Sequence, residues 1–184
     1  MAIEKYVTQA IVLDAYDQGE HDRVYKVFTR EFGLLMCHAK SIRKLESKLR
    51  AHILPRSVSL VTLVRGKEVW RLVGAETVDT PLLYIHEVTN LLKRFVRGEG
   101  AHSALYDRFI STLTCAHEYD EQTIRLLIFY VLLVDLGYAD AKVIGAKDHN
   151  EYSLFSVSDL YTHLLLTKSA VRRHVQEVLK ESQL

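Results

Sequence analysis

The sequence has very few cysteines: only Cys37 and Cys115 occur among 184 residues, and they lie far apart. Two isolated thiols lack the close spacing of a zinc site, and they cannot staple a disulfide-rich secreted fold. Long apolar runs are also missing, because the longest candidate, residues 126–134, is far shorter than the roughly 20 residues that cross a bilayer. With no signal-peptide pattern at the amino terminus, these absences predict a soluble cytoplasmic protein.

Motifs of catalytic sites are missing as well: the chain contains no P-loop, no GxGxxG, no HExxH and no GxSxG. One short cluster, Gly19-Glu20-His21-Asp22, gathers two acids and an imidazole that could mimic a metal or acid–base site. It lies where a turn between two strands is expected, and it lacks the further ligands of a metal site. We therefore expect a structural turn and no enzyme activity. A small metal-dependent enzyme built around this cluster is the alternative.

The first part of the chain has the pattern of short strands. Segments rich in β-branched and aromatic residues alternate with turn signals at residues 8–16, 23–29, 33–39, 57–64 and 68–75. Five such strands without a helical period predict a small closed barrel.

Beyond residue 80 the apolar residues recur at three- and four-residue spacing, which predicts helices. These cover residues 82–96, 103–119 and 120–138, with two short ones near 158–166 and 168–179 after a polar interval at 139–152. The helix at 120–138 is apolar on nearly every side, as is typical of the central helix of a bundle, and Gly137 predicts its end. We expect an α+β protein with a barrel domain, residues 1–80, and an all-α helical domain, residues 81–184.

Basic charge is concentrated in one region, although the chain carries a formal net charge of only +1. Residues 38–73 contain nine bases and two acids, a local net charge of +7, whereas residues 1–37 contain four bases and six acids. Many of these bases lie in the basic segment, defined as residues 39–56, which is predicted to connect the third and fourth strands. A region of one charge sign raises the local concentration of anionic partners.

The basic segment is either an ordinary solvated loop or a surface for a polyanion. Bases continue onto the next predicted strands, and a small barrel with a charged groove is a recurrent platform for single-stranded nucleic acid. We therefore favour a site that neutralises DNA phosphates. The predicted DNA-binding bases are Lys40, Arg43, Lys44, Lys48, Arg50, Arg56, Arg65, Lys67 and Arg71.

Four aromatic residues near this region could stack on bases: Tyr25, Phe28, Phe32 and Trp70. Trp70 is added to the predicted DNA-binding residues because it stands between two of the bases, although an indole in a small barrel is as often part of the core. Tyr25 and Phe28 have opposite parity on their strand, so at most one of them faces outward.

Several short sequences occur in a distinctive order. They are Tyr16-Asp17-Gln18-Gly19-Glu20-His21-Asp22, Phe28-Thr29, Gly33, Ala39-Lys40, Arg43, Ser47-Lys48-Leu49-Arg50, Pro55, Arg65-Gly66, Ala75-Glu76, Phe129–Tyr138 and Lys168-Ser169. This order resembles the RecO family of recombination mediators. Ser41 and Ala51 replace glycines of the family pattern, and Tyr130 replaces a glutamate. Residues 139–153 lack the cysteines of the zinc-binding insertion that many members carry, so we expect no metal and no cofactor.

The resemblance implies an amino-terminal OB-fold and a function without catalysis. Family members bind single- and double-stranded DNA, promote annealing, and act with RecR to load RecA onto strands coated by single-strand-binding protein. They recognise the acidic tail of that coating protein through their helical part. Arg125, at the head of the most apolar helix, is the candidate for this contact, and a solvated arginine at a helix start is the alternative.

A cytoplasmic, nucleoid-associated location follows from this interpretation. A different class of function stays open, namely a protein adaptor whose basic segment docks acidic partners without binding DNA.

Overall fold

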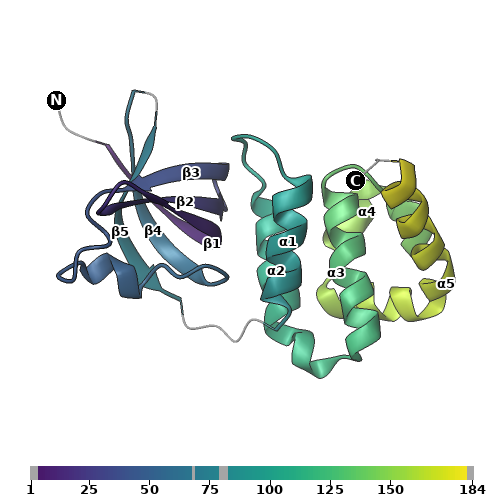
Figure 1. The fold of residues 1–184 in the computed structure, drawn as a ribbon. Coiled ribbons are helices and arrows are strands. Elements are labelled where there is room, and N and C mark those ends of the chain that lie inside the picture. Colours follow the sequence, from purple (N-terminus) through teal and green to yellow (C-terminus); the bar gives the residue numbers. More distant parts are fainter. Residues whose placement is uncertain (1–3, 68, 79–82, 182–184) are drawn as a thin grey trace. The chain divides into compact units, whose positions relative to one another are not determined.

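The computed structural model describes residues 4–67, 69–78 and 83–181 (Figure 1). It divides into two compact units, Met1–Tyr106 and Asp107–Leu184, which we call the barrel unit and the helical unit. The predicted domain boundary at residue 80 lies outside the described residues. The first unit contains the barrel together with the first helix, so it extends well beyond the strands.

Five strands form the closed barrel that the sequence predicts (Figure 1). They are β1 (Lys5–Gln18), β2 (Asp22–Thr29), β3 (Gly33–Ala39), β4 (Val58–Arg65) and β5 (Trp70–Thr77). Their order around the barrel is β1-β2-β3-β5-β4, and β4 pairs with β1 to close it. Only β3 and β5 are parallel, and they share just two residue pairs, Cys37–Trp70 and His38–Arg71. The architecture is that of an OB-fold.

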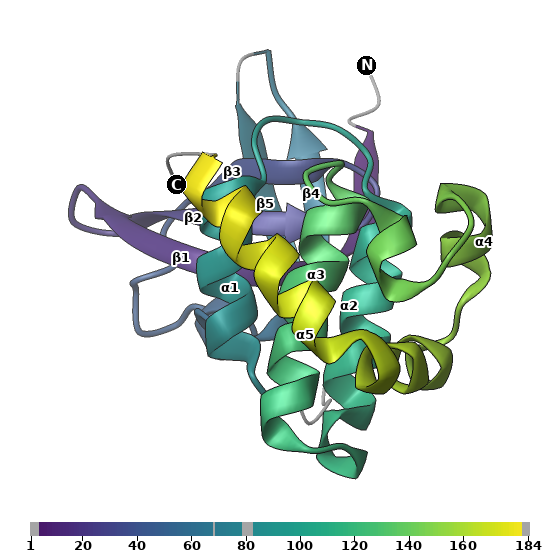
Figure 2. The same cartoon turned by 90° about the vertical axis from the view of Figure 1, so that its right-hand side faces the viewer.

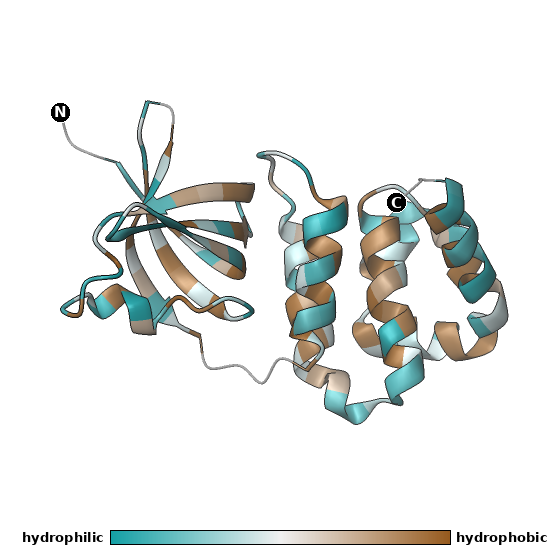
Figure 3. Ribbon diagram, viewed as in Figure 1, coloured by the Kyte–Doolittle hydropathy of each residue, from teal (hydrophilic) through white to brown (hydrophobic). Residues whose placement is uncertain are grey.

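Alternate residues of each strand fill the barrel interior, as the period of a strand requires. Figure 3 shows the resulting alternation of hydrophobic and hydrophilic residues along the strands. The interior cluster includes Ala10, Val12, Tyr25, Val27, Leu35, Cys37, Val61, Leu63, Trp70 and Leu72. Burial raises the pKa of the Cys37 thiol to about 12, so this cysteine stays protonated and contributes only packing.

The barrel unit also buries residues outside this interior cluster. Ile11 and Phe28 are completely buried; the ring of Phe28 lies 6.0 Å from that of Tyr106, which belongs to the same unit. Helix α1 (Ile85–Phe95) contacts β1, and the Lys93 ammonium lies 2.7 Å from the Asp14 carboxylate. The barrel unit therefore has a second apolar layer, to which segments that follow the strands contribute.

The helical unit is organised around α3 (Glu121–Asp135), which buries nine of its residues and packs against α5 (Val157–Glu181) (Figure 2). This arrangement agrees with the apolar pattern of α3. The helix ends beside Gly137, whose φ of +79° is readily adopted by glycine. Helix α2 (Ser103–Cys115) and a short 3₁₀ turn, Ala116–Glu118, precede α3.

Two expectations for the helices are wrong. Residues 158–179 belong to the single helix α5 rather than to two short helices, because no glycine or proline interrupts them. The interval 139–152 contains a 3₁₀ turn, Ala141–Ile144, and helix α4 (His149–Leu154), whose N-cap Asp148 accepts a hydrogen bond from the Glu151 N–H. Within the residues described here, each helix is too short or too polar to cross a bilayer.

Candidate nucleic-acid interface

The basic segment is attached to the β1–β2 turn immediately after β3 ends. The Ser41 N–H donates to the Asp22 carboxylate over 2.7 Å, and the Arg43 N–H donates to the His21 carbonyl over 3.0 Å. Two residues of the Gly19–Asp22 cluster therefore act as acceptors that hold the segment in place. This is the structural turn expected from the sequence. In the described part of the chain, no three His, Cys, Asp or Glu side chains are arranged to hold a metal ion.

The Arg43 side chain reinforces the same attachment. Its guanidinium donates to the Gly19 carbonyl over 3.0 Å and lies 3.4 Å from the Asp17 carboxylate. Asp17 also pairs with Arg23 at 2.7 Å. Arg43 thus differs from the other bases of the basic segment, because its charge is already used in part to fix the loop.

The departures from the family pattern have local explanations. Ser41 has a φ of +54°, in the left-handed region that favours glycine, and its hydrogen bond to Asp22 compensates for the strained backbone. Ala51 closes a 3₁₀ turn, Lys48–Ala51, where no glycine is needed. Tyr130 is buried, and its hydroxyl donates to the Asp140 carbonyl over 2.7 Å. Ser41 and Ala51 are therefore both compatible with the observed backbone of the basic segment.

The basic segment is also anchored by buried side chains at both ends and by hydrogen bonds near its far end. Ile42 and Ile53 are buried in the barrel's apolar cluster, with 1% exposure each. The Arg56 N–H donates to the Val12 carbonyl over 2.7 Å, and the Ser59 hydroxyl donates to the His52 carbonyl over 2.8 Å. The segment is therefore an ordered part of the barrel unit rather than a tether between two strands.

Five cations of the basic segment are exposed and lack an acidic partner. Across the residues that the structure describes, no carboxylate lies within 4.0 Å of these side chains. They are Lys40, Lys44, Lys48, Arg50 and Arg56. Unpaired, solvated cations on an ordered segment remain available to an anionic ligand.

The cations on β4, on β5 and in the turn between them differ in whether another side chain already engages them. Arg65 lies 3.6 Å from the Glu99 carboxylate, and its guanidinium is 5.2 Å from the centre of the Trp70 ring. Lys67 and Arg71 are exposed. Arg65 is thus partly engaged, whereas Lys67 and Arg71 can extend the basic surface.

Trp70 is a core residue, and its inclusion among the DNA-binding residues is corrected. Only 4% of it is exposed, and its ring packs against Tyr6 and Phe32 at centroid distances of 5.6 and 5.2 Å. The indole N–H donates to the Glu99 carboxylate over 3.3 Å. The ring satisfies its apolar and polar groups inside the barrel unit, so it presents no face to a base.

Tyr25 and Phe28 are unavailable for stacking as well. Tyr25 lies in the barrel interior, while Phe28, of opposite parity, is covered by the ring of Tyr106. Tyr25 and Phe28 do point to opposite faces of β2, but the second face is buried as well, because Tyr106 of α2 covers it.

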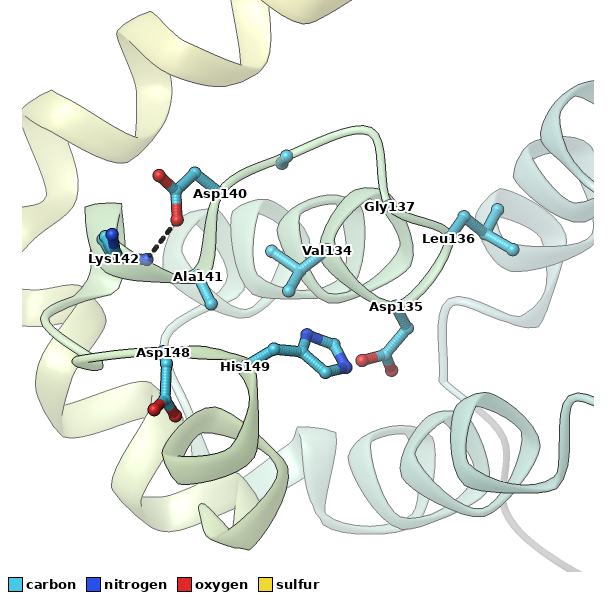
Figure 4. Close-up of a pocket in the computed structure, with 10 residues that line it drawn as sticks. Val134, Asp135, Leu136, Gly137, Asp140, Ala141, Lys142, Asp148 and His149 are labelled. Carbon is cyan, nitrogen blue, oxygen red and sulfur yellow. Dashed lines mark hydrogen bonds between the residues drawn. The ribbon is translucent and has the colours of Figure 1, made fainter.

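In the helical unit, Arg125 is exposed and pairs with Glu121, one turn earlier on α3, at 3.0 Å. A pocket of about 570 Å³ lies near the opposite end of α3 (Figure 4). It is lined by Val134, Asp135, Leu136, Gly137, Ala139, Asp140, Ala141, Lys142, Asp148 and His149. Apart from Asp135, which pairs with Arg108, the pocket lining has two aspartates and one lysine, so it offers no excess positive charge to an acidic peptide.

Beside this pocket lies a buried ion pair that sequence reasoning did not identify. The Arg108 Nε is 3.3 Å from the Asp135 carboxylate, and the two side chains are 11% and 7% exposed. The Arg108 guanidinium also stacks on Tyr152, 4.5 Å from the ring centre. Burial raises the pKa of Asp135, and the nearby guanidinium opposes that shift. The pair has a structural role in the helical unit.

Comparison with known proteins agrees with this architecture. Residues 1–81 match the family model described as Recombination protein O N terminal. The chain is 30% identical over 143 residues to the DNA repair protein RecO of Dehalococcoides mccartyi, covering 72% of the chain and 56% of that protein. Over 172 residues it is 30% identical to the DNA repair protein RecO of Syntrophotalea carbinolica, covering 85% of the chain and 67% of that protein.

A third similarity, to the DNA repair protein RecO of Heliobacterium modesticaldum, reaches 40% identity over 75 residues, covering 41% of the chain and 28% of that protein. The chain spans about half the length of the first of these relatives and about two thirds of the second. The similarity to the second relative extends well beyond the barrel. The chain belongs to the RecO family.

Proposed function

We propose that this chain is a non-enzymatic, DNA-binding recombination mediator that acts in DNA repair in the cytoplasm, at the nucleoid. Its relatives are named DNA repair proteins, and its barrel unit carries an ordered segment rich in exposed bases. The observation that carries the proposal is the set of five cations, Lys40, Lys44, Lys48, Arg50 and Arg56, that have no carboxylate partner among the described residues.

The mechanism is electrostatic. Lysine and arginine side chains neutralise backbone phosphates and release condensed counterions, which favours binding to single- and double-stranded DNA without sequence preference. Lys67 and Arg71 extend the surface beyond the basic segment. When two strands occupy one positive surface, their mutual repulsion falls, so annealing proceeds faster without any catalytic group.

The partners belong to the same proposal. Membership of the family implies cooperation with RecR, recognition of the acidic tail of single-strand-binding protein, and indirect loading of RecA. In the helical unit, an acidic tail requires a base beside apolar side chains. Arg125 offers the base, and its exposed pair with Glu121 costs little to exchange for another carboxylate.

The salt dependence of binding tests the DNA-binding part of this proposal. The full chain is titrated with a labelled single strand at several salt concentrations. Contact with about five phosphates predicts a slope of log K against log salt of about −3.5. A chain that gives no mobility shift at low salt but binds an acidic peptide would instead be a protein adaptor.

A further inference from the structure

Leu45 lies in the middle of the basic segment and is 89% exposed, the largest value for a large apolar side chain in the described part of the chain. Its neighbours Lys44 and Glu46 are exposed as well. An isolated exposed leucine is common on a protein surface. The position of this one, beside the cations that are proposed to hold a strand, calls for a functional explanation.

The backbone presents Leu45 at the apex of a turn. The Ser47 N–H donates to the Lys44 carbonyl over 3.1 Å, which closes a turn with Leu45 and Glu46 at its centre. A second bond, from the Lys44 N–H to the Ser41 carbonyl over 3.2 Å, supports the chain just before it. Because the segment is anchored in the barrel on both sides, the apex is held in a defined place.

The basic segment itself contains no phenylalanine, tyrosine or tryptophan that could stack on a base. The rings of Tyr25, Phe28 and Trp70, predicted as stacking candidates, are buried, and Phe32 is packed against Trp70. Tyr16 is 48% exposed, but it lies on β1 and outside the basic segment. Within the segment itself, an apolar contact to a base therefore falls to an aliphatic side chain.

We propose that Leu45 packs against the face of an unstacked base in a strand whose phosphates are held by the neighbouring cations. The inference rests on the proposed DNA binding and names the residue that contacts the bases. Leucine is among the side chains that proteins insert between bases to unstack them. Contact with a base face is tolerant of sequence, because every base presents such a face.

Leu54 provides a matched control. It lies on the same segment and is also exposed, at 55%, but it is not at the apex of the turn. It stands between the buried Ile53 and Pro55, next to the point where Arg56 is hydrogen-bonded to β1. Replacing Leu54 by alanine shortens an exposed leucine of the same segment without altering the apex.

The experiment uses the full chain, a single strand with 2-aminopurine between adenines, and saturating protein. 2-Aminopurine brightens when its neighbours unstack. Wild type and Leu54→Ala are expected to brighten the probe equally, whereas Leu45→Ala should give less than about half of the rise. Leu45→Ala should also bind about fivefold more weakly with an unchanged salt slope, because no phosphate contact is removed. Leu45→Phe should brighten the probe as much as the wild type does, or more.

The outcomes separate this inference from the proposed function. The wild type could bind with the expected salt slope while wild type, Leu45→Ala and Leu45→Phe brighten the probe equally. In that case Leu45 contacts no base, and the proposed DNA binding stands. If the wild type fails to bind the strand at low salt, the proposed function and this inference fail together.

Discussion

The two units of the chain distribute their cations differently. In the helical unit, Arg108 pairs with Asp135, Arg125 with Glu121 and Lys168 with Asp120. Its exposed cations without a carboxylate partner among the described residues are spread over the unit, and they are Lys142, Lys147, Arg172, Arg173 and Lys180. In the barrel unit, the basic segment presents five cations that have no carboxylate near them among the described residues. The comparison shows that the lack of an acidic partner does not by itself mark a binding surface. What distinguishes the basic segment is that its five unpaired cations lie together within residues 39–56, on a stretch that is hydrogen-bonded to the barrel.

The largest effect is expected at the buried pair of the helical unit. Replacing Arg108 by alanine leaves the Asp135 carboxylate buried and uncompensated, which should lower the free energy of unfolding by about 3 kcal/mol. The loss should be smaller at acidic pH, because burial already raises the pKa of Asp135 and its protonated form carries no charge to desolvate. Urea unfolding followed by far-ultraviolet circular dichroism measures the change.

Arg125→Ala is the control for that variant. Its exposed pair with Glu121, one helical turn away, contributes only about 0.3 to 0.5 kcal/mol. Equal losses in Arg108→Ala and Arg125→Ala would contradict a stabilising role for the buried pair. Binding to DNA should be unchanged in Arg108→Ala under conditions where the protein remains folded.

In the barrel unit, charge reversal of the basic segment should abolish binding without unfolding the protein. The variant Lys40→Glu/Lys44→Glu/Lys48→Glu should bind a single strand at least about 100-fold more weakly and lose about 2 from the salt slope. A fluorescence-anisotropy titration at several salt concentrations measures the affinity and the salt slope. The fluorescence of the single tryptophan, Trp70, reports whether the barrel remains folded. Unchanged binding would remove the basic segment from the interface.

Arg43 is left out of this variant for a structural reason. Its guanidinium is bound to Asp17 and Gly19, so a glutamate there would face Asp17 and loosen the attachment of the segment. A loss of binding in an Arg43 variant would therefore mix two effects, whereas the three lysines report on charge alone.

The smallest effect is expected at the surface ion pair that joins α1 to β1. The Lys93 ammonium, which donates to Asp14 over 2.7 Å, holds the pKa of this carboxyl below its ordinary value of 3.8. A lowered pKa means that the stabilisation is present above this ordinary value and disappears as the pH falls through the folded-state pKa. Asp14→Asn should cost about 0.5 kcal/mol at neutral pH, after allowance for solvent screening, because both side chains are about one-third exposed.

The difference between the wild type and Asp14→Asn should vanish in acid. Urea unfolding of both proteins, followed by Trp70 fluorescence across the acidic range, checks this expectation. A constant difference at every pH would mean that the amide disturbs packing and that the charge of Asp14 is unimportant.

Local signals predict much of the fold. The five strands, their closure into a small barrel and the apolar α3 follow from β-rich segments, turn residues and helical spacing, and Gly137 correctly predicts the end of α3. The OB-fold was implied by the resemblance to the RecO family. The single helix α5 was predicted as two short helices, although no glycine or proline within it interrupts a helix. Helix α4 was missed because it is short and polar.

The candidate site was less predictable than the fold. Sequence places Lys40 and Lys44 on a long connection, but it does not show that Arg43 pairs with Asp17, since the two residues meet only through the barrel. The same limit explains why Trp70 was wrongly included among the DNA-binding residues. Its position between two cations suggests exposure, whereas its side chain points into the barrel. The Arg108–Asp135 pair carried no sequence signal, because nothing local relates the two residues.

The contact between Gly33 and Gly100 bears on how this protein can be divided. A side chain on Gly33 would meet the Gly100 carbonyl at 2.2 Å; the Leu34 N–H donates to Gly98, and the Gly100 N–H donates to Phe32. The start of β3 is thus hydrogen-bonded by the backbone of Gly98 and Gly100, which lie beyond the five strands. A fragment ending at residue 80 would lose these bonds and uncover Phe28, so weak DNA binding by such a fragment would reflect damage to the barrel. A fragment that continues to the end of α2, at Cys115, retains these bonds and the whole helix that carries Tyr106.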